Sequence, residues 1–297
     1  MNPASSLIIF TVFSGLGFGT FFWLGCGYFV SGSQSLMAFL IAFSFSLSGL
    51  ISSAFHLGNP QRALLAFTQW RSSWLSREAI LAVLALILNF FYAFLIVFFD
   101  YYSTVLGIFS AFFALITVFA TAMIYTQMKT VPRWNMPVTP LMFLLYSITG
   151  GSIITSIFSR DLLIFNSLSL LLTACFQIYS WRKGDTKYRM KTDIGSATGL
   201  SYIGLVRLLE PPHTGSNYLL HEMVYIVAQK HSHKLRWITL VLCFLTPSLL
   251  FIIISYKNIF FLAVFVIAIL LHLTGALIAR WLFFAEAEHV VGLYYDR

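Results

Sequence analysis

The sequence predicts an all-α fold, a polytopic membrane protein whose eight transmembrane helices form one bundle. Composition is the first observation behind this prediction: of 297 residues, 59% are hydrophobic and only 9% are charged, whereas about 25% of the residues of a soluble protein carry a charge. The second is that the apolar residues gather in eight runs, each near the roughly 20 residues that cross a bilayer as a helix. We therefore expect residues 1–297 to form a single integral membrane domain.

The expected helices follow one another with mostly short connections. Their approximate ranges are 5–30, 35–57, 78–99, 104–128, 139–158, 161–181, 236–255 and 258–284. The segment 182–235 is the one long connection, and we expect it to be an aqueous loop. The cysteines Cys26, Cys175 and Cys243 fall in apolar runs without paired spacing. We therefore expect them to form no disulfide and to bind no iron–sulfur cluster.

Glycines in the first expected helix indicate where another helix can come close. Gly15 and Gly19 form a G-x-x-x-G pair, which permits close helix–helix packing in membranes. The alternative is that glycine is merely tolerated at these positions.

Lysine and arginine predict the orientation of the bundle. Three basic residues follow the second helix, two follow the fourth, eight lie in the long loop with Arg236 directly after it, and two lie at the C-terminal end. Only Arg160 and Lys257 fall on the opposite side. Cytoplasmic loops carry the excess of basic residues, so we expect both termini and the long loop on the cytoplasmic side of the inner (cytoplasmic) membrane.

The connection after the second helix delivers three ionisable side chains to one membrane face. The second apolar run ends at His56, and Gly58 and Pro60 stop the helix. Arg62 follows, and the third run begins near Glu78. A connection between consecutive spans starts and ends on the same face, so the imidazole, guanidinium and carboxylate meet beside the hydrocarbon. Such a trio can exchange protons with a lipid-soluble hydroquinone.

Three stretches together resemble a known family. Residues 56–63 read HLGNPQRA, similar to the HLG-x-P-x-RA signature of the membrane anchor subunits of dimethyl sulfoxide (DMSO) reductases. Residues 130–140, from TVPRW to TP, and residues 273–280, LTGALIAR, also agree and occur in the same order. The long loop looks closer to the anchors of membrane-bound, sulfite-oxidising molybdoenzymes.

The resemblance implies partners and a substrate. Anchors of this family hold a molybdopterin catalytic subunit and a four-cluster ferredoxin-like iron–sulfur subunit at the membrane. They exchange electrons with a quinone, menaquinone or ubiquinone, which comes and goes from the lipid. On this reading the chain carries no haem, iron–sulfur cluster or other metal, binds no nucleic acid, and leaves the chemistry of the sulfur substrate to its partner.

The resemblance implies a role for each of the three ionisable residues, and each role has an alternative. Neutral His56 accepts a proton from the quinol hydroxyl, for which its unperturbed pKa near 6.5 is suited; it could instead interact with the last carbonyls of its own helix. Glu78 is the proton outlet, or simply a carboxylate in a first helical turn after an N-cap at Ser76. Arg62 stabilises a reduced quinone, or contacts a lipid phosphate or an acidic patch of a partner.

A second group of residues ends the fourth expected helix on the same face. Tyr125, Lys129, Arg133 and Trp134 fit an interfacial anchor, since Trp and Tyr are enriched there. Tyr125 could instead donate a hydrogen bond to a quinone carbonyl. We expect the iron–sulfur subunit to dock on the loops of this face, with the contact residues Arg71, Arg133, Arg207, Glu210 and His213.

Two other classes of protein remain as alternatives. A di-haem cytochrome b anchor needs pairs of axial histidines, but only His272 lies in mid-span and His56 lies at a helix end. A multi-span transporter typically carries matched broken helices in two halves, and no such pair is evident here.

Overall fold

The computed structural model describes residues 3–28, 33–55, 59–190, 194–207, 209–210, 226–256 and 261–290. In this part of the chain the structure is all-helical, and eight helices are long and apolar enough to cross a membrane. The predicted fold class and the number of spans are therefore confirmed.

Eight helical stretches make the spans. They are α1 (Ser5–Gly25), α2 (Ser33–Ala54), α3 (Trp74–Phe99), α4 (Thr104–Thr126), α5 (Val138–Thr155), α6 (Leu163–Met190), α9 (Ile226–Thr239) with α10 (Thr246–Tyr256), and α11 (Phe261–Ala285). A π-helical turn, η3 (Leu240–Leu245), joins α9 to α10 within one span. Three short elements lie in connections: the 3-10 helices η1 (Pro60–Phe67) and η2 (Arg160–Leu162), and α7 (Ile194–Thr198).

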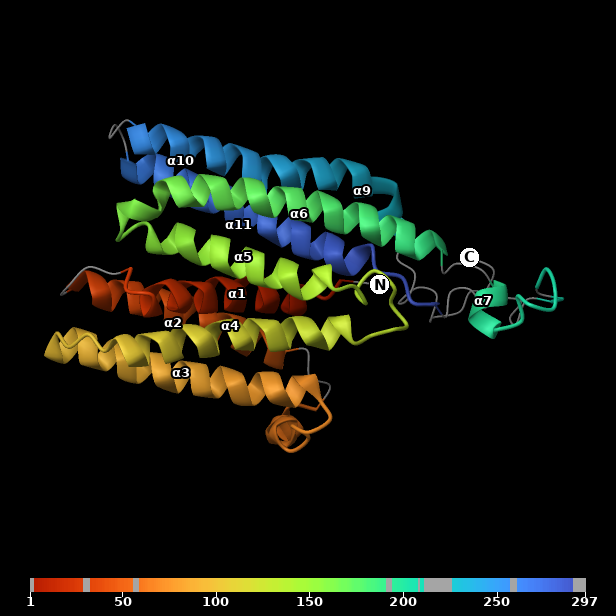
Figure 1. The fold of residues 1–297 in the computed structure, drawn as a ribbon, viewed down its shortest axis with the longest axis horizontal. Coiled ribbons are helices and arrows are strands. Elements are labelled where there is room, and N and C mark those ends of the chain that lie inside the picture. Colours follow the sequence, from red (N-terminus) through yellow and green to blue (C-terminus); the bar gives the residue numbers. More distant parts are fainter. Residues whose placement is uncertain are drawn as a thin grey trace.

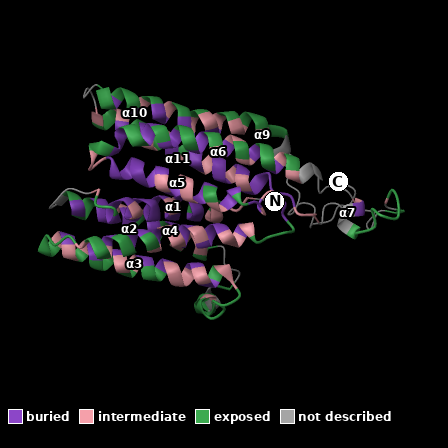
Figure 2. Ribbon diagram, in the orientation of Figure 1, coloured by how far each residue is buried: buried purple, intermediate pink, exposed green. Residues whose placement is uncertain are grey.

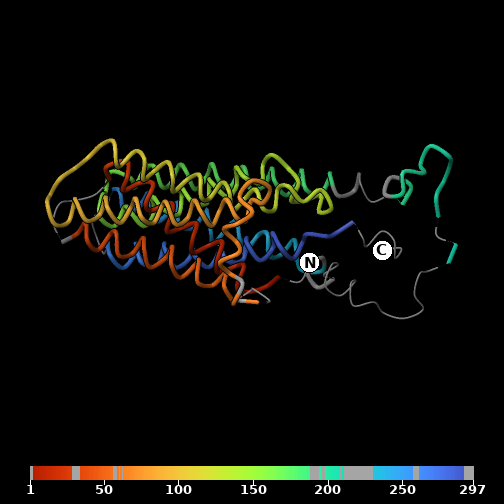
Figure 3. The backbone as a smooth tube through the Cα atoms, turned by 90° about the horizontal axis from the view of Figure 1, so that it is seen from below, coloured from red at the N-terminus to blue at the C-terminus, as the bar shows by residue number. Residues whose placement is uncertain are grey.

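The helices run side by side along the long axis of the molecule (Figure 1). Because each connection reverses the chain, the start of α1, η1, the α4–α5 connection and the end of α11 all lie at the right-hand end in Figure 1. We call this end of the bundle the basic end, because the connections that carry most of the Lys and Arg residues lie there. In the turned view, α7 also lies beyond the basic end, clear of the helices (Figure 3).

Helix α1 occupies the centre of the bundle and packs against α2, α4 and α5. Two glycines allow the closest approaches. A Cβ on Gly17 would collide with Ser46 Oγ of α2, and a Cβ on Gly19 would collide with the Ser147 carbonyl oxygen of α5. A Cβ on Gly15 would meet nothing within 4 Å. The close packing predicted for the Gly15–Gly19 pair is therefore confirmed for Gly19, whereas no neighbour occupies the position that a Gly15 side chain would take.

Burial follows the expectation for a bundle surrounded by lipid. Buried residues concentrate on α1 and α5, whereas α3 and α10 present many exposed positions (Figure 2). Those positions are apolar: Phe90 is 58% exposed, Phe91 55% and Ile253 54%. A soluble protein seldom exposes so large an apolar surface, so these faces are suited to hydrocarbon.

Several expected helix boundaries differ from the structure by a few residues, and the segment 182–235 and the start of α3 matter most for the site. Helix α6 continues to Met190 and α9 begins at Ile226, so both ends of the segment 182–235 are helical. Helix α3 begins at Trp74 after Ser73, so the expected N-cap at Ser76 is wrong and Glu78 lies in the second turn. Arg77 explains the early start, since it donates to the carbonyl oxygens of Trp70 and Arg71 and fixes the entering chain.

Candidate functional site

A cavity of about 80 Å³ lies inside the bundle, between α1, α4, α5, α6 and α11. It extends from the α4–α5 connection at the basic end to His272 in the middle of α11. This volume is enough for several water molecules. Its wall combines aromatic rings with small polar and charged side chains. The residues that line it include Gly15, Thr121, Arg133, Trp134, Phe143, Tyr146, His272, Arg280, Leu282, Phe283 and Glu286.

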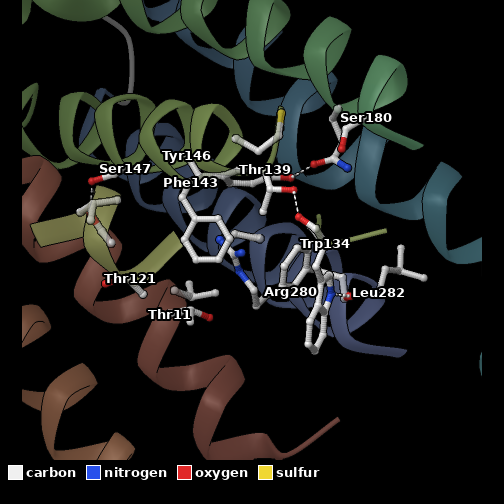
Figure 4. A pocket seen from close by; sticks show the side chains of 18 of the residues that line it. Thr11, Thr121, Trp134, Thr139, Phe143, Tyr146, Ser147, Ser180, Arg280 and Leu282 are labelled. Atoms are coloured by element: carbon white, nitrogen blue, oxygen red, sulfur yellow. Dashed lines mark hydrogen bonds between the residues drawn. The ribbon is translucent and has the colours of Figure 1, made fainter. Parts of the chain in front are cut away.

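The guanidinium of Arg280 is the central charged group of this cavity. Arg280 is only 8% exposed, and its guanidinium carbon lies 3.8 Å from the centroid of the Phe143 ring. Figure 4 shows the two side chains next to each other. The rings of Phe283 and Tyr146 lie at 5.3 and 5.9 Å. Among the described residues none forms an ion pair with Arg280. Cation–π contacts contribute about 2 kcal/mol when desolvated, less than the several kcal/mol that burial of a charge costs.

Four charged side chains form a compact cluster where the cavity meets the basic end. Asp185 of α6 binds Arg133 at 2.5 Å and Arg236 at 2.8 Å, and Glu286 binds the same two arginines at 3.4 and 2.8 Å. The cluster joins the α4–α5 connection, α6, α9 and the segment after α11. Two positive and two negative charges balance within it, so neither carboxylate is left over for Arg280.

On the α4 side of the cavity, Glu78 and Thr121 form a buried pair. The Thr121 hydroxyl donates a hydrogen bond to a carboxylate oxygen of Glu78, and the two residues are each 5% exposed. Thr121 also lines the cavity. An ionisable group inside a membrane span is expensive to bury and commonly functional. Glu78 thus lies one hydroxyl group away from the cavity of Arg280.

Tyr125 lies one helical turn after Thr121 on α4, in a cluster of aromatic rings. Its ring centroid is 5.3 Å from that of Trp134, 5.7 Å from Phe143 and 5.5 Å from Phe283. Trp134 also donates its indole N–H to the Phe283 carbonyl oxygen at 2.8 Å. Tyr125 and Trp134 are 7% and 4% exposed, so neither ring projects into a lipid interface. Trp134 lines the cavity, and Tyr125 packs against it from behind.

His272 forms the inner end of the cavity and has a structural task. Pro247 has no N–H to donate to the carbonyl four residues earlier, which is that of Cys243. The Nδ1 atom of His272 lies 2.9 Å from this carbonyl oxygen. A carbonyl only accepts, so Nδ1 carries the proton and Nε2 keeps its lone pair. Nε2 is buried and has no hydrogen-bond partner in the described part of the chain.

The structure brings together some of the residues predicted from the sequence. Glu78 and Tyr125 both lie beside the cavity, and Arg133 belongs to the charge cluster at its outer end. Arg71, Arg207 and Glu210 are exposed and do not line the cavity. His56 and His213 lie outside the described residues, and for Arg62 only the backbone, in η1, is described.

The sequence reasoning missed Arg280 as a site residue, although one signal was present. Arg280 is the only Lys or Arg between residues 258 and 284, and an ionisable side chain inside an apolar span is a functional candidate. For Thr121 no signal existed, because hydroxyl side chains are common in membrane helices and usually bond their own backbone.

Comparison with known proteins gives two matches. The family model described as DMSO reductase anchor subunit (DmsC) matches residues 1–285. The chain is also 28% identical over 329 aligned residues to a sulfite dehydrogenase subunit from Allochromatium vinosum, and the alignment covers 100% of this chain and 99% of that protein. No solved structure matches the chain.

Proposed function

The chain belongs to the DMSO reductase anchor subunit family, and from this premise we propose that it passes electrons between a membrane quinone and an iron–sulfur subunit. Family membership makes it a multi-pass membrane anchor that associates with catalytic molybdoenzyme subunits. The finer assignment is our own: a four-cluster ferredoxin-like subunit and a molybdopterin subunit as partners, and menaquinone or ubiquinone as the exchanged substrate.

The observation that carries the quinone assignment is the buried pair of Glu78 and Thr121 at the cavity edge. A quinone changes its protonation together with its redox state, so its site needs a group that exchanges protons. A carboxylate one turn inside a span, near its start at the basic end, supplies such a group. Glu78 lies near the start of α3, which contacts η1, and His56 precedes η1 in the sequence.

Oxidation of one hydroquinone breaks two O–H bonds and releases two protons and two electrons. His56 and Glu78 accept the protons and pass them to water at the basic end, and the electrons go to the nearest cluster of the iron–sulfur partner. When electrons flow the other way, the same groups return two protons to the quinone.

The similarity to a subunit of a sulfite dehydrogenase favours electron flow from the partner subunits to the quinone. A sulfite-oxidising partner takes up water, releases two electrons per sulfite, and thus reduces quinone. A DMSO-reducing partner consumes two electrons and oxidises quinol. The excess of Lys and Arg at the basic end supports a cytoplasmic location for the partners and both termini, which agrees with sulfite oxidation inside the cell.

The test compares two carboxylate-to-amide changes on the same helix in the assembled complex. Glu78→Gln keeps a hydrogen-bond acceptor for Thr121 but cannot take up a proton, so quinone-linked turnover should fall by about 10²-fold. Activity with an artificial electron carrier that bypasses the quinone should persist. Asp100→Asn at the far end of α3 is the matched control, since Asn tolerates the left-handed conformation of Asp100 (φ 50°). Normal quinone kinetics in Glu78→Gln would refute the assignment.

A further inference from the structure

Arg280 is the one charged residue of the cavity wall that no other described residue neutralises. The carboxylates at the outer end, Asp185 and Glu286, are each already bound to both Arg133 and Arg236. Glu78 is bonded to Thr121. A buried guanidinium carries five N–H donors and no acceptor, so this cavity is complete only with a molecule that brings an accepting oxygen.

The remaining walls select a flat, apolar molecule. Phe143 lies under the guanidinium at 3.8 Å, and Trp134 and Phe283 stack on each other with an interplanar angle of 16° and centroids 5.4 Å apart. Tyr146 and Leu282 complete the apolar surround. Aromatic pairs prefer such offset or edge contacts, which a quinone ring can also make.

We propose that this cavity binds the quinone head group and that Arg280 donates hydrogen bonds to one of its oxygens. The inference rests on the quinone exchange proposed above and adds its location and its main binding residue. The carbonyl of a quinone and the hydroxyl of a quinol both accept hydrogen bonds, so Arg280 binds either redox form. As electrons arrive, that oxygen gains negative charge, and a guanidinium already in position stabilises it without reorganisation.

The position of Thr121 connects this binding site to proton exchange. Its hydroxyl bonds Glu78 on one side, and its side chain faces the cavity on the other. A proton that leaves the quinol therefore has a carboxylate within one hydroxyl of the ring. At the inner end, the unpartnered Nε2 of His272 accepts a hydrogen bond from the bound molecule or from a water beside it.

The test measures binding and turnover separately in the detergent-purified complex. Arg280→Gln removes the charge, Arg280→Lys keeps the charge but loses the planar fork, and Arg160→Gln is the matched control. Arg160 also lies over a ring, 4.2 Å from the Phe261 centroid, but at the opposite end of the bundle and exposed to solvent. We expect the Kd for decylubiquinone to rise at least tenfold in Arg280→Gln, less in Arg280→Lys, and not at all in Arg160→Gln.

A second variant tests the location without removing the arginine. A Cβ on Gly15 meets nothing within 4 Å, and Gly15 lines the cavity. In Gly15→Leu the new side chain occupies part of the cavity that Arg280 also lines, so quinone binding should fall while activity with the artificial carrier persists. If the Arg280→Gln complex fails to assemble, Gly15→Leu still tests whether the quinone binds in this cavity.

The outcomes separate this inference from the proposed function. Suppose that Arg280→Gln and Gly15→Leu both bind quinone as the wild type does, while Glu78→Gln loses turnover. That result would refute quinone binding in this cavity but would agree with the proposed quinone exchange. Absence of any quinone-linked turnover in the wild-type complex would overturn the function itself. If Arg280→Gln binds quinone normally but loses co-purified phosphatidylglycerol, the occupant is an anionic lipid and the inference is wrong.

Discussion

Arg236 and Glu286, 50 residues apart in the sequence, bind each other through two hydrogen bonds of 2.8 and 3.0 Å. This fork connects α9 to the segment that follows α11. The two side chains are 13% and 7% exposed, so water screens the pair only weakly. Bidentate contacts of this kind fix orientation as well as distance.

Removal of this arginine should loosen the basic end. Arg236→Met leaves Glu286 and Asp185 to share Arg133 alone, and loss of one partner of a buried pair costs about 3–5 kcal/mol. Since Asp185 is 35% exposed, we expect about 2 kcal/mol and a lower Tm of the solubilised anchor. The exposed Arg71 provides the control, because Arg71→Met should change the stability by about 0.5 kcal/mol or less. Equal Tm values in both variants would show that the cluster does not stabilise the fold.

Two glycines on α1 should respond to alanine in opposite directions. In Gly19→Ala the new Cβ would collide with the Ser147 carbonyl oxygen, so α1 and α5 must separate, at a cost of about 1–3 kcal/mol. In Gly15→Ala the Cβ enters free space, and the better helix propensity of alanine should raise the stability by up to about 1 kcal/mol. Thermal unfolding in detergent measures both, and a Gly19→Ala protein as stable as the wild type would contradict this packing of α1 on α5.

His56→Leu should separate assembly from quinone exchange. Leucine keeps the bulk of the side chain but cannot accept a proton, so quinone-linked turnover should fall by about 10²-fold. The partner subunits should remain in the membrane, and activity with an artificial carrier should persist. Quinone kinetics equal to those of the wild type would mean that His56 only interacts with the end of its own helix.

Deletion of residues 208–222 should release the soluble partners. The connection between α6 and α9 and the adjoining helix ends hold nine basic residues, and Arg207 and Glu210 are exposed, so this segment offers a charged docking surface. We expect the anchor to stay in the membrane fraction while the iron–sulfur and catalytic subunits become soluble. Retention of both partners by the shortened anchor would place the docking surface elsewhere.

A reporter fused after Arg297 measures sidedness. The distribution of Lys and Arg predicts a cytoplasmic C-terminus, so alkaline phosphatase fused there should be inactive and a fluorescent protein should fluoresce. If the chain exchanges electrons with quinone as proposed, the catalytic subunits must dock on the face where that exchange takes place, because electrons would otherwise cross about 30 Å of hydrocarbon. Active phosphatase would place the partners outside and remove the preference for sulfite oxidation.

The spans were predictable from the sequence because an apolar run of sufficient length is a local property. Helix ends outside the membrane were not, since α6 continues to Met190 through polar residues that carry no hydropathy signal. For the same reason Ser76, in place of Ser73, was expected to begin α3.

The candidate site was predictable only for residues that lie near each other in the sequence. Glu78 and His56 flank one connection, and their proximity to one membrane face follows from the order of the helices. The contact of Glu78 with Thr121, and the position of Arg280 against Phe143, depend on which helices become neighbours. A single sequence does not contain that information, because an apolar helix can pack against several others with similar energy.

The proline in the seventh span and the histidine in the eighth form a compensating pair. Pro247 leaves the Cys243 carbonyl without its helical donor, and His272 supplies the missing hydrogen from another helix. Each residue alone is unfavourable in a membrane, because no water is present there to form a hydrogen bond with an unsatisfied polar group. The stabilities of variants at the two positions should therefore be coupled: loss of the His272 imidazole should cost less when alanine at position 247 restores an N–H for the Cys243 carbonyl oxygen than when Pro247 is present.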